Sequence, residues 1–125
     1  ALPDNGKYRE DNVSMTFTFP DGSLGVVDYL ANGDKSFAKE RVEVFCGGTI
    51  AVLDDFRKLE TVKDGKRKEE KRTQDKGWTD EWKAFAKSIR EGSAPPIPYE
   101  QLIGVTKATF AAVESIRTGN PIKIS

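Results

Sequence analysis

Hydrophobic and polar residues alternate along the first half of the chain, which is the pattern of β-strands with one apolar face. An Asp-Gly pair at Asp64-Gly65 lies between two extended runs, and this is the strongest short signal for a β-hairpin. Shorter turn signals are present at Pro20-Asp21-Gly22 and at Gly47-Gly48. The sequence predicts six strands, at residues 13–19, 24–30, 42–46, 49–54, 56–63 and 66–73.

The second half of the chain changes to the 3.6-residue period of amphipathic helices. Thr79 is the expected N-cap of a first helix, and Gly92 is expected to end it. A second helix is expected from Tyr99 to Arg117, where Gly119 stops it. The expected inner stripes consist of Trp82, Phe85, Ala86 and Ile89 in the first helix, and of Leu102, Val105, Thr109, Ala112, Val113 and Ile116 in the second.

Strands that run together before the helices indicate the α+β class, since α/β folds alternate the two kinds of element. If Ile122 and Ile124 form a short final strand, the sheet has about six or seven strands. We expect this sheet to be largely antiparallel or mixed, with both helices packed on one face. Ser14, Thr16 and Thr18 point away from the apolar residues of the first strand, so they are interface candidates on the other face. A sheet covered on one side favours a homodimer through the other.

Composition excludes several classes of function. The 125 residues are 37% hydrophobic, which is enough for a core, and 20 basic residues balance 20 acidic ones. This balance does not favour capture of nucleic acid or of a membrane surface. The single cysteine rules out an internal disulfide, and no apolar run approaches the roughly 20 residues of a membrane span, so the cytoplasm is the expected location. The first residue is Ala1 rather than methionine, which indicates a processed or excised fragment.

Candidate chemistry in the chain is limited by the absence of histidine. Ser-His and Cys-His pairs and histidine-ligated metal sites are therefore impossible within it. Cys46 is expected to be a buried core residue on its strand. Asp54 and Asp55 look like a carboxylate pair, but neighbours on a strand point to opposite faces and could not share one site unless a bulge or turn intervened. We expect them at a strand end that enters a turn. Asp28 is expected on an exposed face. We expect no catalytic, cofactor-binding or metal-binding residue in the chain.

Residues 57–76 carry nine basic and five acidic residues, a net charge of +4. They contain no aromatic residue that could stack on single-stranded nucleic acid. The expected role is a solvated hairpin face, and the alternative is a contact surface of a non-catalytic protein-binding module. Trp78 follows this segment and is interpreted as a packing residue, with a site-facing role as the alternative.

Several stretches resemble the C-terminal domain of the Gfo/Idh/MocA oxidoreductases, the family of glucose–fructose oxidoreductase and the inositol dehydrogenases. Residues 19–25, Phe-Pro-Asp-Gly-Ser-Leu-Gly, are similar to the F-x-D-G-S-x-G hairpin of that family. Residues 43–48, followed by 54–56, are similar to its E-V-x-G-x-x-G strand pair. The Asp-Lys-Gly at 75–77 and the stretch at 111–122 resemble its C-terminal part. The order and spacing of these motifs, over roughly residues 12–124, carry the resemblance.

The resemblance implies that residues 1–125 are the C-terminal α+β domain of such an enzyme, incomplete at the N-terminal side and without its Rossmann domain. The full-length protein would use NAD or NADP on a sugar, a cyclitol or a related polyol. The chain would shape the pocket, form oligomers and be inactive alone, with its own Rossmann domain as partner. The family's catalytic Asp/His pair has no counterpart here, and Trp78 replaces the histidine that often follows Asp-Lys-Gly. Tyr29, Lys76 and Trp78 are the candidates for lining the substrate pocket.

Overall fold

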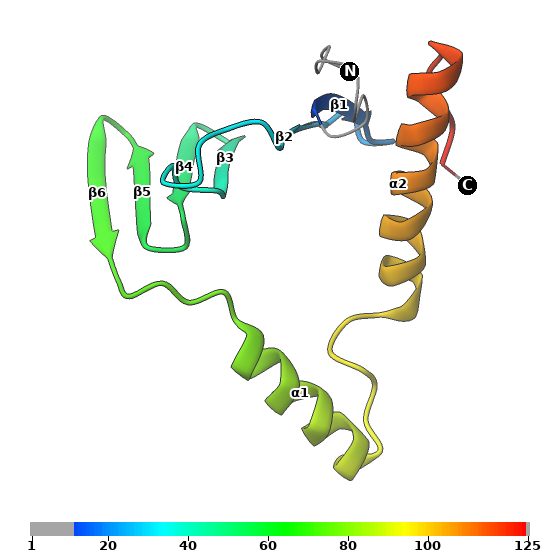
Figure 1. Cartoon of the computed structure of the whole chain (residues 1–125). Coiled ribbons are helices and arrows are strands. Elements are labelled where there is room, and N and C mark those ends of the chain that lie inside the picture. Colours follow the sequence, from blue (N-terminus) through cyan, green and yellow to red (C-terminus); the bar gives the residue numbers. More distant parts are fainter. Residues whose placement is uncertain (1–11, 125) are drawn as a thin grey trace. The chain divides into compact units, whose positions relative to one another are not determined.

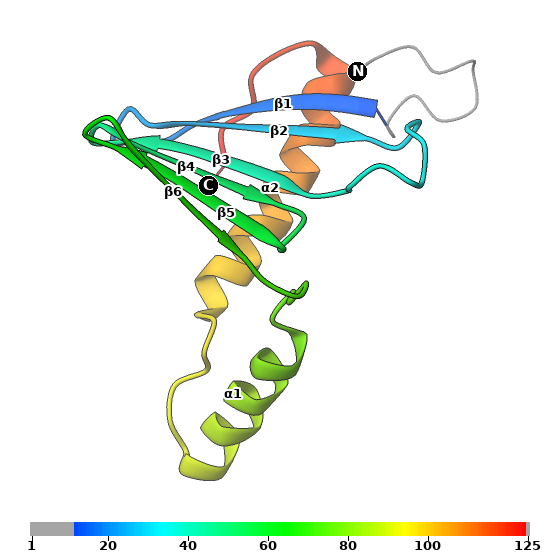
Figure 2. The ribbon, with the colours of Figure 1, turned by 90° about the vertical axis from the view of Figure 1, so that its left-hand side faces the viewer.

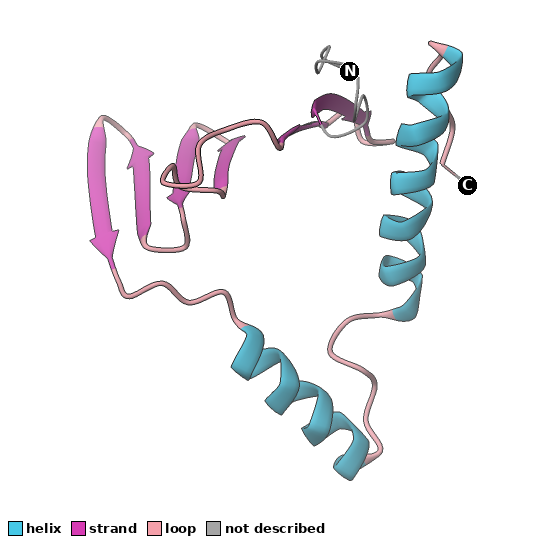
Figure 3. Cartoon of the chain, viewed as in Figure 1, coloured by secondary structure: helices cyan, strands magenta, loops and turns pink. Residues whose placement is uncertain are grey.

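The computed structural model describes residues 12–124 (Figures 1 and 3). The loop expected at residues 1–11 lies outside this range. The described chain divides into two compact units, which we describe separately. The first contains residues 12–33 and 97–124, and the second contains residues 34–96.

The first unit begins with an antiparallel hairpin of β1 (Asn12–Thr18) and β2 (Leu24–Leu30). The turn between them forms where Pro20-Asp21-Gly22 predicted it. The Asp21 carboxylate accepts hydrogen bonds from the backbone N–H of Ser23, at 3.0 Å, and from its hydroxyl, at 2.7 Å. Gly22 takes a φ of 85°, a conformation that costs least for glycine. The family-like motif is thus a locally closed turn.

The helix of the first unit, α2 (Tyr99–Thr118), ends where the sequence predicted. Gly119 caps it in the left-handed conformation, and its N–H donates to the carbonyl of Ser115 at 2.8 Å. The short strand expected around Ile122 and Ile124 does not form, so this prediction is wrong. Two β-branched residues do not make a strand without a neighbouring strand to pair with.

The second unit contains a four-stranded antiparallel meander in the order β3-β4-β5-β6 (Figure 2). Its strands are β3 (Arg41–Cys46), β4 (Thr49–Asp54), β5 (Lys58–Lys63) and β6 (Lys66–Lys71). Each connection uses two residues with positive φ, as tight hairpins require. Gly47-Gly48 and Asp64-Gly65 were predicted as turns, and a turn was also expected after the strand end at Asp54-Asp55, but Phe56 was assigned to the next strand. The strand expected from Phe56 therefore begins at Lys58, because Phe56 belongs to the turn.

Helix α1 (Trp78–Glu91) completes the second unit. It begins two residues earlier than predicted, because Gly77 is its N-cap and not Thr79. Gly77 has a φ of 77° and offers no side chain to the helix end, while its own N–H donates to the Asp75 carboxylate at 2.8 Å. Gly92 ends the helix in the left-handed conformation, as expected.

The α+β class and the antiparallel pairing of six strands are confirmed. Hydrogen bonds divide these strands into a two-stranded and a four-stranded sheet, where the sequence suggested one sheet of six or seven strands. Helix α1 makes no close backbone approach to the strands of its unit, whereas Ala111, Ala112, Val113 and Ile116 in the second half of α2 are half-buried. Among residues 12–124, Val13 is the only buried hydrophobic residue. Of the expected inner residues, Ala112, Val113 and Ile116 are half-buried. Trp82, Phe85, Ile89, Leu102 and Val105 are exposed, because amphipathic spacing marks an apolar face without supplying its cover.

Candidate functional site

The open face of the β1–β2 hairpin carries the predicted interface residues. Ser14, Thr16 and Thr18 are all exposed, as their alternation with apolar residues predicted. Strand pairing places each of them directly opposite a residue of β2 on the same face. The opposing residues are Asp28, Val26 and Leu24, and of these the two apolar side chains are exposed. A row of hydroxyls beside two exposed aliphatic side chains and one carboxylate forms a surface suited to protein contact. We call it the open hairpin face.

The sequence missed the apolar half of this surface. Residues 24–30 alternate less cleanly than β1, since Leu24, Val26 and Leu30 lie on one side while Val27 and Tyr29 lie on the other. A strand that is apolar on both sides is typical of a strand covered on both sides. The apolar residues on both sides of β2 were therefore the sequence signal from which this half of the surface could have been predicted.

The other side of the hairpin is its inner side. Val13 is buried, and Met15 and Phe17 are half-buried. Tyr29 pairs with Val13 on this side but is itself exposed. Tyr29 therefore presents a phenol at the edge of the apolar surface, an arrangement compatible with a polar ligand.

Lys76 is engaged in an ion pair at the end of the β3–β6 sheet. Its ammonium lies 2.6 Å from the Glu40 carboxylate and 6.0 Å from the centroid of the Phe56 ring. The side chains of Lys76 and Glu40 are 26% and 37% exposed. The second oxygen of Glu40 is buried and has no hydrogen-bond partner in the described part of the chain. The ammonium is thus already used by the protein, and nothing in the sequence identified Glu40 as its partner.

Three further hydrogen bonds join segments of the chain next to this ion pair. The backbone N–H of Asp55 donates to the carbonyl of Glu40 at 2.8 Å. The Gln74 amide donates to the carbonyl of Asp55 at 3.0 Å, and the backbone N–H of Asp75 donates to the carbonyl of Phe56 at 3.4 Å. Three segments distant in sequence therefore meet at one end of the sheet. We call this arrangement the sheet-end clasp.

Trp78 lies just beyond the clasp, as the first residue of α1, and it is exposed. The packing interpretation is therefore not realised within the second unit. Lys76 and Trp78 are separated only by Gly77, whereas Tyr29 belongs to the first unit. Lys76 and Trp78 are therefore close because they are two residues apart in the chain, and no contact between their side chains is observed in the described part of the chain.

The β3–β6 sheet carries apolar side chains on both faces, and the face with Phe45, Ile50, Val52 and Val62 also carries ion pairs. Its register places Val42, Leu53 and Leu59 in one row, and the next row on the same face begins with Val44 and Ala51. We call this side the apolar sheet face, and its members are Val42, Val44, Cys46, Ala51, Leu53 and Leu59. Part of it is hollowed into a shallow depression of about 200 Å³ beside Phe56 and Arg72.

Cys46 lies on the apolar sheet face and is exposed, so the prediction of a buried core cysteine is wrong. The reason is that nothing in the second unit covers its strand, since every residue of β3 is exposed. Asp28 is exposed, as predicted. Asp54 ends β4 and Asp55 enters the turn, which confirms the interpretation of this pair as a strand end.

Several ion pairs lie on the opposite side of the sheet and along β6. Lys58 and Lys71 both contact Glu69, at 3.6 and 3.1 Å, and Arg67 contacts Glu60 at 3.0 Å. The hydrogen bond from Lys71 is the main cause that holds the pKa of the Glu69 carboxyl below its usual value. Lys68 and Arg72 have the same effect on the pKa of Glu70, with the hydrogen bond from Lys68 as the largest cause. Most of the charge in the 57–76 segment is therefore matched within the protein.

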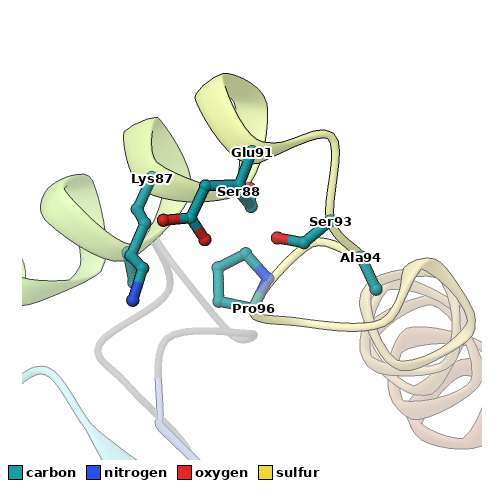
Figure 4. Close-up of a pocket in the computed structure, with 7 residues that line it drawn as sticks. Lys87, Ser88, Glu91, Ser93, Ala94 and Pro96 are labelled. Carbon is teal, nitrogen blue, oxygen red and sulfur yellow. The ribbon is translucent and has the colours of Figure 1, made fainter.

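A second depression, of about 260 Å³, lies at the C-terminal end of α1 (Figure 4). Its polar lining comes from Lys87, Ser88, Glu91 and Ser93, and Pro96 closes one side. The Ser88 hydroxyl already donates to the carbonyl of Phe85 at 2.8 Å. The depression thus offers no nucleophile beside a base. It does show that the segment after α1 folds back over the Ala84 and Ser88 side of the helix.

No group of acidic or cysteine side chains that could hold a metal ion is present in residues 12–124. None of the described helices is both long and apolar enough to cross a membrane. No family model, curated protein or solved structure matches the chain.

Proposed function

We propose that this chain is the pocket-shaping and oligomerisation domain of a cytoplasmic, nicotinamide-dependent oxidoreductase that acts on a sugar, a cyclitol or a related polyol. A separate Rossmann domain would bind NAD or NADP and supply the proton-transfer residues. The chain alone would be inactive. The family-like motifs of the sequence support this proposal.

The observation that carries the proposal is the lack of a hydrophobic core inside either unit. Val13 is the only buried hydrophobic residue of the described chain, although a chain of this size and composition normally buries many. Apolar side chains instead lie exposed on both sheets and on both helices. Such surfaces are those of a part that is completed by other protein.

Within this proposal, the open hairpin face is the interface of a homodimer. Thr16 and Val26 lie opposite each other at its centre. A two-fold axis that lies in this face and crosses both strands at this pair would place Thr16 against Thr16 and Val26 against Val26 of the other copy, so that hydroxyls meet hydroxyls and aliphatic groups meet at the centre. The exposed aliphatic side chains supply the apolar contact, and the hydroxyls supply hydrogen bonds.

Calorimetric titration with NADH tests the proposal that a separate Rossmann domain, and not this chain, binds the cofactor. We expect the isolated chain to release no heat of binding, because the chain would hold only the pocket side of the active site. As a positive control, the same titration is run with a Rossmann-domain dehydrogenase. Saturable NADH binding by the chain alone would contradict the proposal.

Light scattering tests the interface. We expect the double variant Thr16→Arg, Val26→Arg to lose the dimer, because the substitutions bring like charges together across the two-fold axis. Phe37→Arg is the control, since it adds the same kind of charge at an exposed residue in the loop before β3. A double variant with unchanged mass would rule out this face as the interface.

A second candidate function is a protein-binding module that uses the charged hairpin. It is favoured by Lys63 and Lys66 at the hairpin tip, which have no ion-pair partner in the described part of the chain. Reversing the charges of Lys66, Arg67 and Lys71 separates the two candidates. Loss of an acidic partner protein with oligomers intact would favour the module, and unchanged binding would exclude it.

A further inference from the structure

Three like-charged pairs face each other across the hairpin of β5 and β6 (Figure 1). The strand register places Lys58 opposite Lys71, Glu60 opposite Glu69, and Lys63 opposite Lys66. Like charges directly opposite each other in an antiparallel pair of strands destabilise it. Each pair therefore needs an opposite charge beside it.

Two of the three pairs have such a charge within the protein. The Glu69 carboxylate contacts the ammonium groups of both Lys58 and Lys71, at 3.6 and 3.1 Å. The guanidinium of Arg67 contacts Glu60 at 3.0 Å, so Glu60 and Glu69 each have a cation beside them. The repulsion within these two pairs is thus offset.

Lys63 and Lys66 have no such counterion. Both side chains are exposed at the tip of the hairpin, and neither forms an ion pair within residues 12–124. Asp64 lies in the turn between them, but it also forms no ion pair in that range. No ion pair with a described residue therefore offsets their mutual repulsion.

The apolar sheet face, which the two lysines share by register with Cys46, offers no spare carboxylate. Glu70 is the only acidic residue on this face of the four strands. Lys68 and Arg72 already contact Glu70, at 2.8 and 3.1 Å. Two adjacent positive charges are thus left for an anion from outside the chain.

We propose that Lys63, Lys66 and Thr49 form a binding site for the phosphate group of a phosphate monoester. Thr49 lies opposite Lys63 on β4, so its side chain is on the same face as the two lysines. The three residues form one row across three adjacent strands, each about 5 Å from the next. The site belongs entirely to the second unit.

The charge and the donors of this row match a phosphate better than a carboxylate. A phosphate monoester carries a charge of about −1.5 to −2 at neutral pH and has three strong acceptor oxygens. One phosphate group can neutralise both ammonium groups and accept a hydrogen bond from Thr49, whereas one carboxylate neutralises a single lysine. Lysine binds phosphate as a point charge, and its flexible side chain lets both ammonium groups reach the same anion.

Calorimetric titration of the full chain with glycerol 1-phosphate tests the site. We expect saturable binding that weakens by about tenfold or more in the double variant Lys63→Gln, Lys66→Gln. The matched control is Lys35→Gln, Lys39→Gln, which removes two positive charges from exposed residues of the loop before β3 and should leave the affinity almost unchanged. Equal weakening in the two double variants would overturn the proposal. No binding to the parent would also overturn it, because another acidic group would then already neutralise the pair.

Further titrations at constant ionic strength identify the chemistry of the ligand. Glycerol, which has no phosphate, should not bind. Inorganic phosphate should bind no more tightly than glycerol 1-phosphate, and tighter binding would overturn the monoester in favour of free phosphate. Glutarate tests whether the carboxylates of an acidic protein are the better occupant, and binding as tight as that of glycerol 1-phosphate would overturn the proposal. An equal response to sodium chloride would reduce the effect to general screening and would overturn it as well.

Lys63→Glu gives a second measurement that a failure to fold cannot imitate. The substitution places a carboxylate opposite Lys66, so it should raise the melting temperature in phosphate-free buffer. Glycerol 1-phosphate should raise the melting temperature of the parent but not that of the variant, since the variant supplies its own counterion. A variant that melts below the parent in phosphate-free buffer would show that the two lysines do not repel each other, and would overturn the proposal.

Discussion

The ammonium of Lys76 lies 2.6 Å from the carboxylate of Glu40, although 36 residues separate them in the chain. This pair joins the residue before β3 to the segment that leads into α1. It is partly buried, and one oxygen of Glu40 has no partner within residues 12–124. We therefore expect that loss of the Lys76–Glu40 contact lowers the free energy of unfolding more than loss of an exposed ion pair does.

Lys76→Met should destabilise the protein by about 1–2 kcal/mol, between the effect of an exposed pair and that of a buried one. The substitution keeps the aliphatic stem but leaves a partly buried carboxylate without its cation. Urea denaturation measures the change in the free energy of unfolding. Lys83→Met is the matched control, because its partner Asp80 and Lys83 itself are 76% and 72% exposed, and the change there should stay within about 0.5 kcal/mol. Equal effects of the two substitutions would contradict this interpretation.

Gly65 and Gly104 should respond in opposite ways to alanine. Gly65 has a φ of 71° in the hairpin turn, so Gly65→Ala should cost about 1 kcal/mol. Gly104 is helical and an added methyl group would meet only open space, so Gly104→Ala should stabilise the protein by about 0.5–1 kcal/mol. Thermal denaturation gives both values. A stabilised Gly65→Ala protein would show that the turn is not formed in solution.

Gly77 should discriminate between alanine and asparagine. Its φ of 77° at the start of α1 strains any residue with a side chain, but asparagine tolerates this conformation and can cap a helix. Gly77→Ala should therefore lower the free energy of unfolding by about 1 kcal/mol, and Gly77→Asn by less. Denaturant titration of the two variants, with Thr79→Ala as a control at the cap that the sequence predicted, tests the register of the helix start. A larger loss from Thr79→Ala would place the cap at Thr79.

Ser23→Ala should raise the pKa of Asp21 toward its ordinary value. The hydrogen bond from the Ser23 hydroxyl is the main cause that lowers the pKa of this carboxyl, and the backbone N–H of Ser23 is the second. A lowered pKa means that the turn contributes stability at pH values above the unfolded pKa, and that this contribution is lost as pH falls through the folded one. Carboxyl-carbon NMR titration follows the group directly.

Asp34 and Ser36 provide the comparison for this titration. There the backbone N–H is the larger cause that lowers the pKa of Asp34, and the Ser36 hydroxyl is the smaller one. Ser36→Ala should thus raise the pKa of Asp34 by less than Ser23→Ala raises that of Asp21. The reverse order would show that the two turns do not have these hydrogen bonds.

Local signals in the sequence predicted most of the elements. The Asp64-Gly65 turn, the helix ends at Gly92 and Gly119 and the alternation in β1 each depend on residues close together in the chain. A turn was expected after Asp54-Asp55, but the place of Phe56 in it was missed, because positive φ is rare for a bulky residue and no local preference indicates it. Of the candidate site, the hydroxyl row of β1 was predictable, whereas the Lys76–Glu40 pair was not.

The sequence by itself determined which residues form strands and helices and which side of each element is apolar, because these properties follow from backbone preferences and from periodicity over a few residues. Tertiary structure alone decided what those apolar sides contact. It left Cys46 and Trp82 exposed where their type and spacing predicted burial, and it paired Lys76 with Glu40. The physical reason is that a side chain is buried only when a segment distant in sequence, or another molecule, packs against it. A local sequence pattern does not specify that packing.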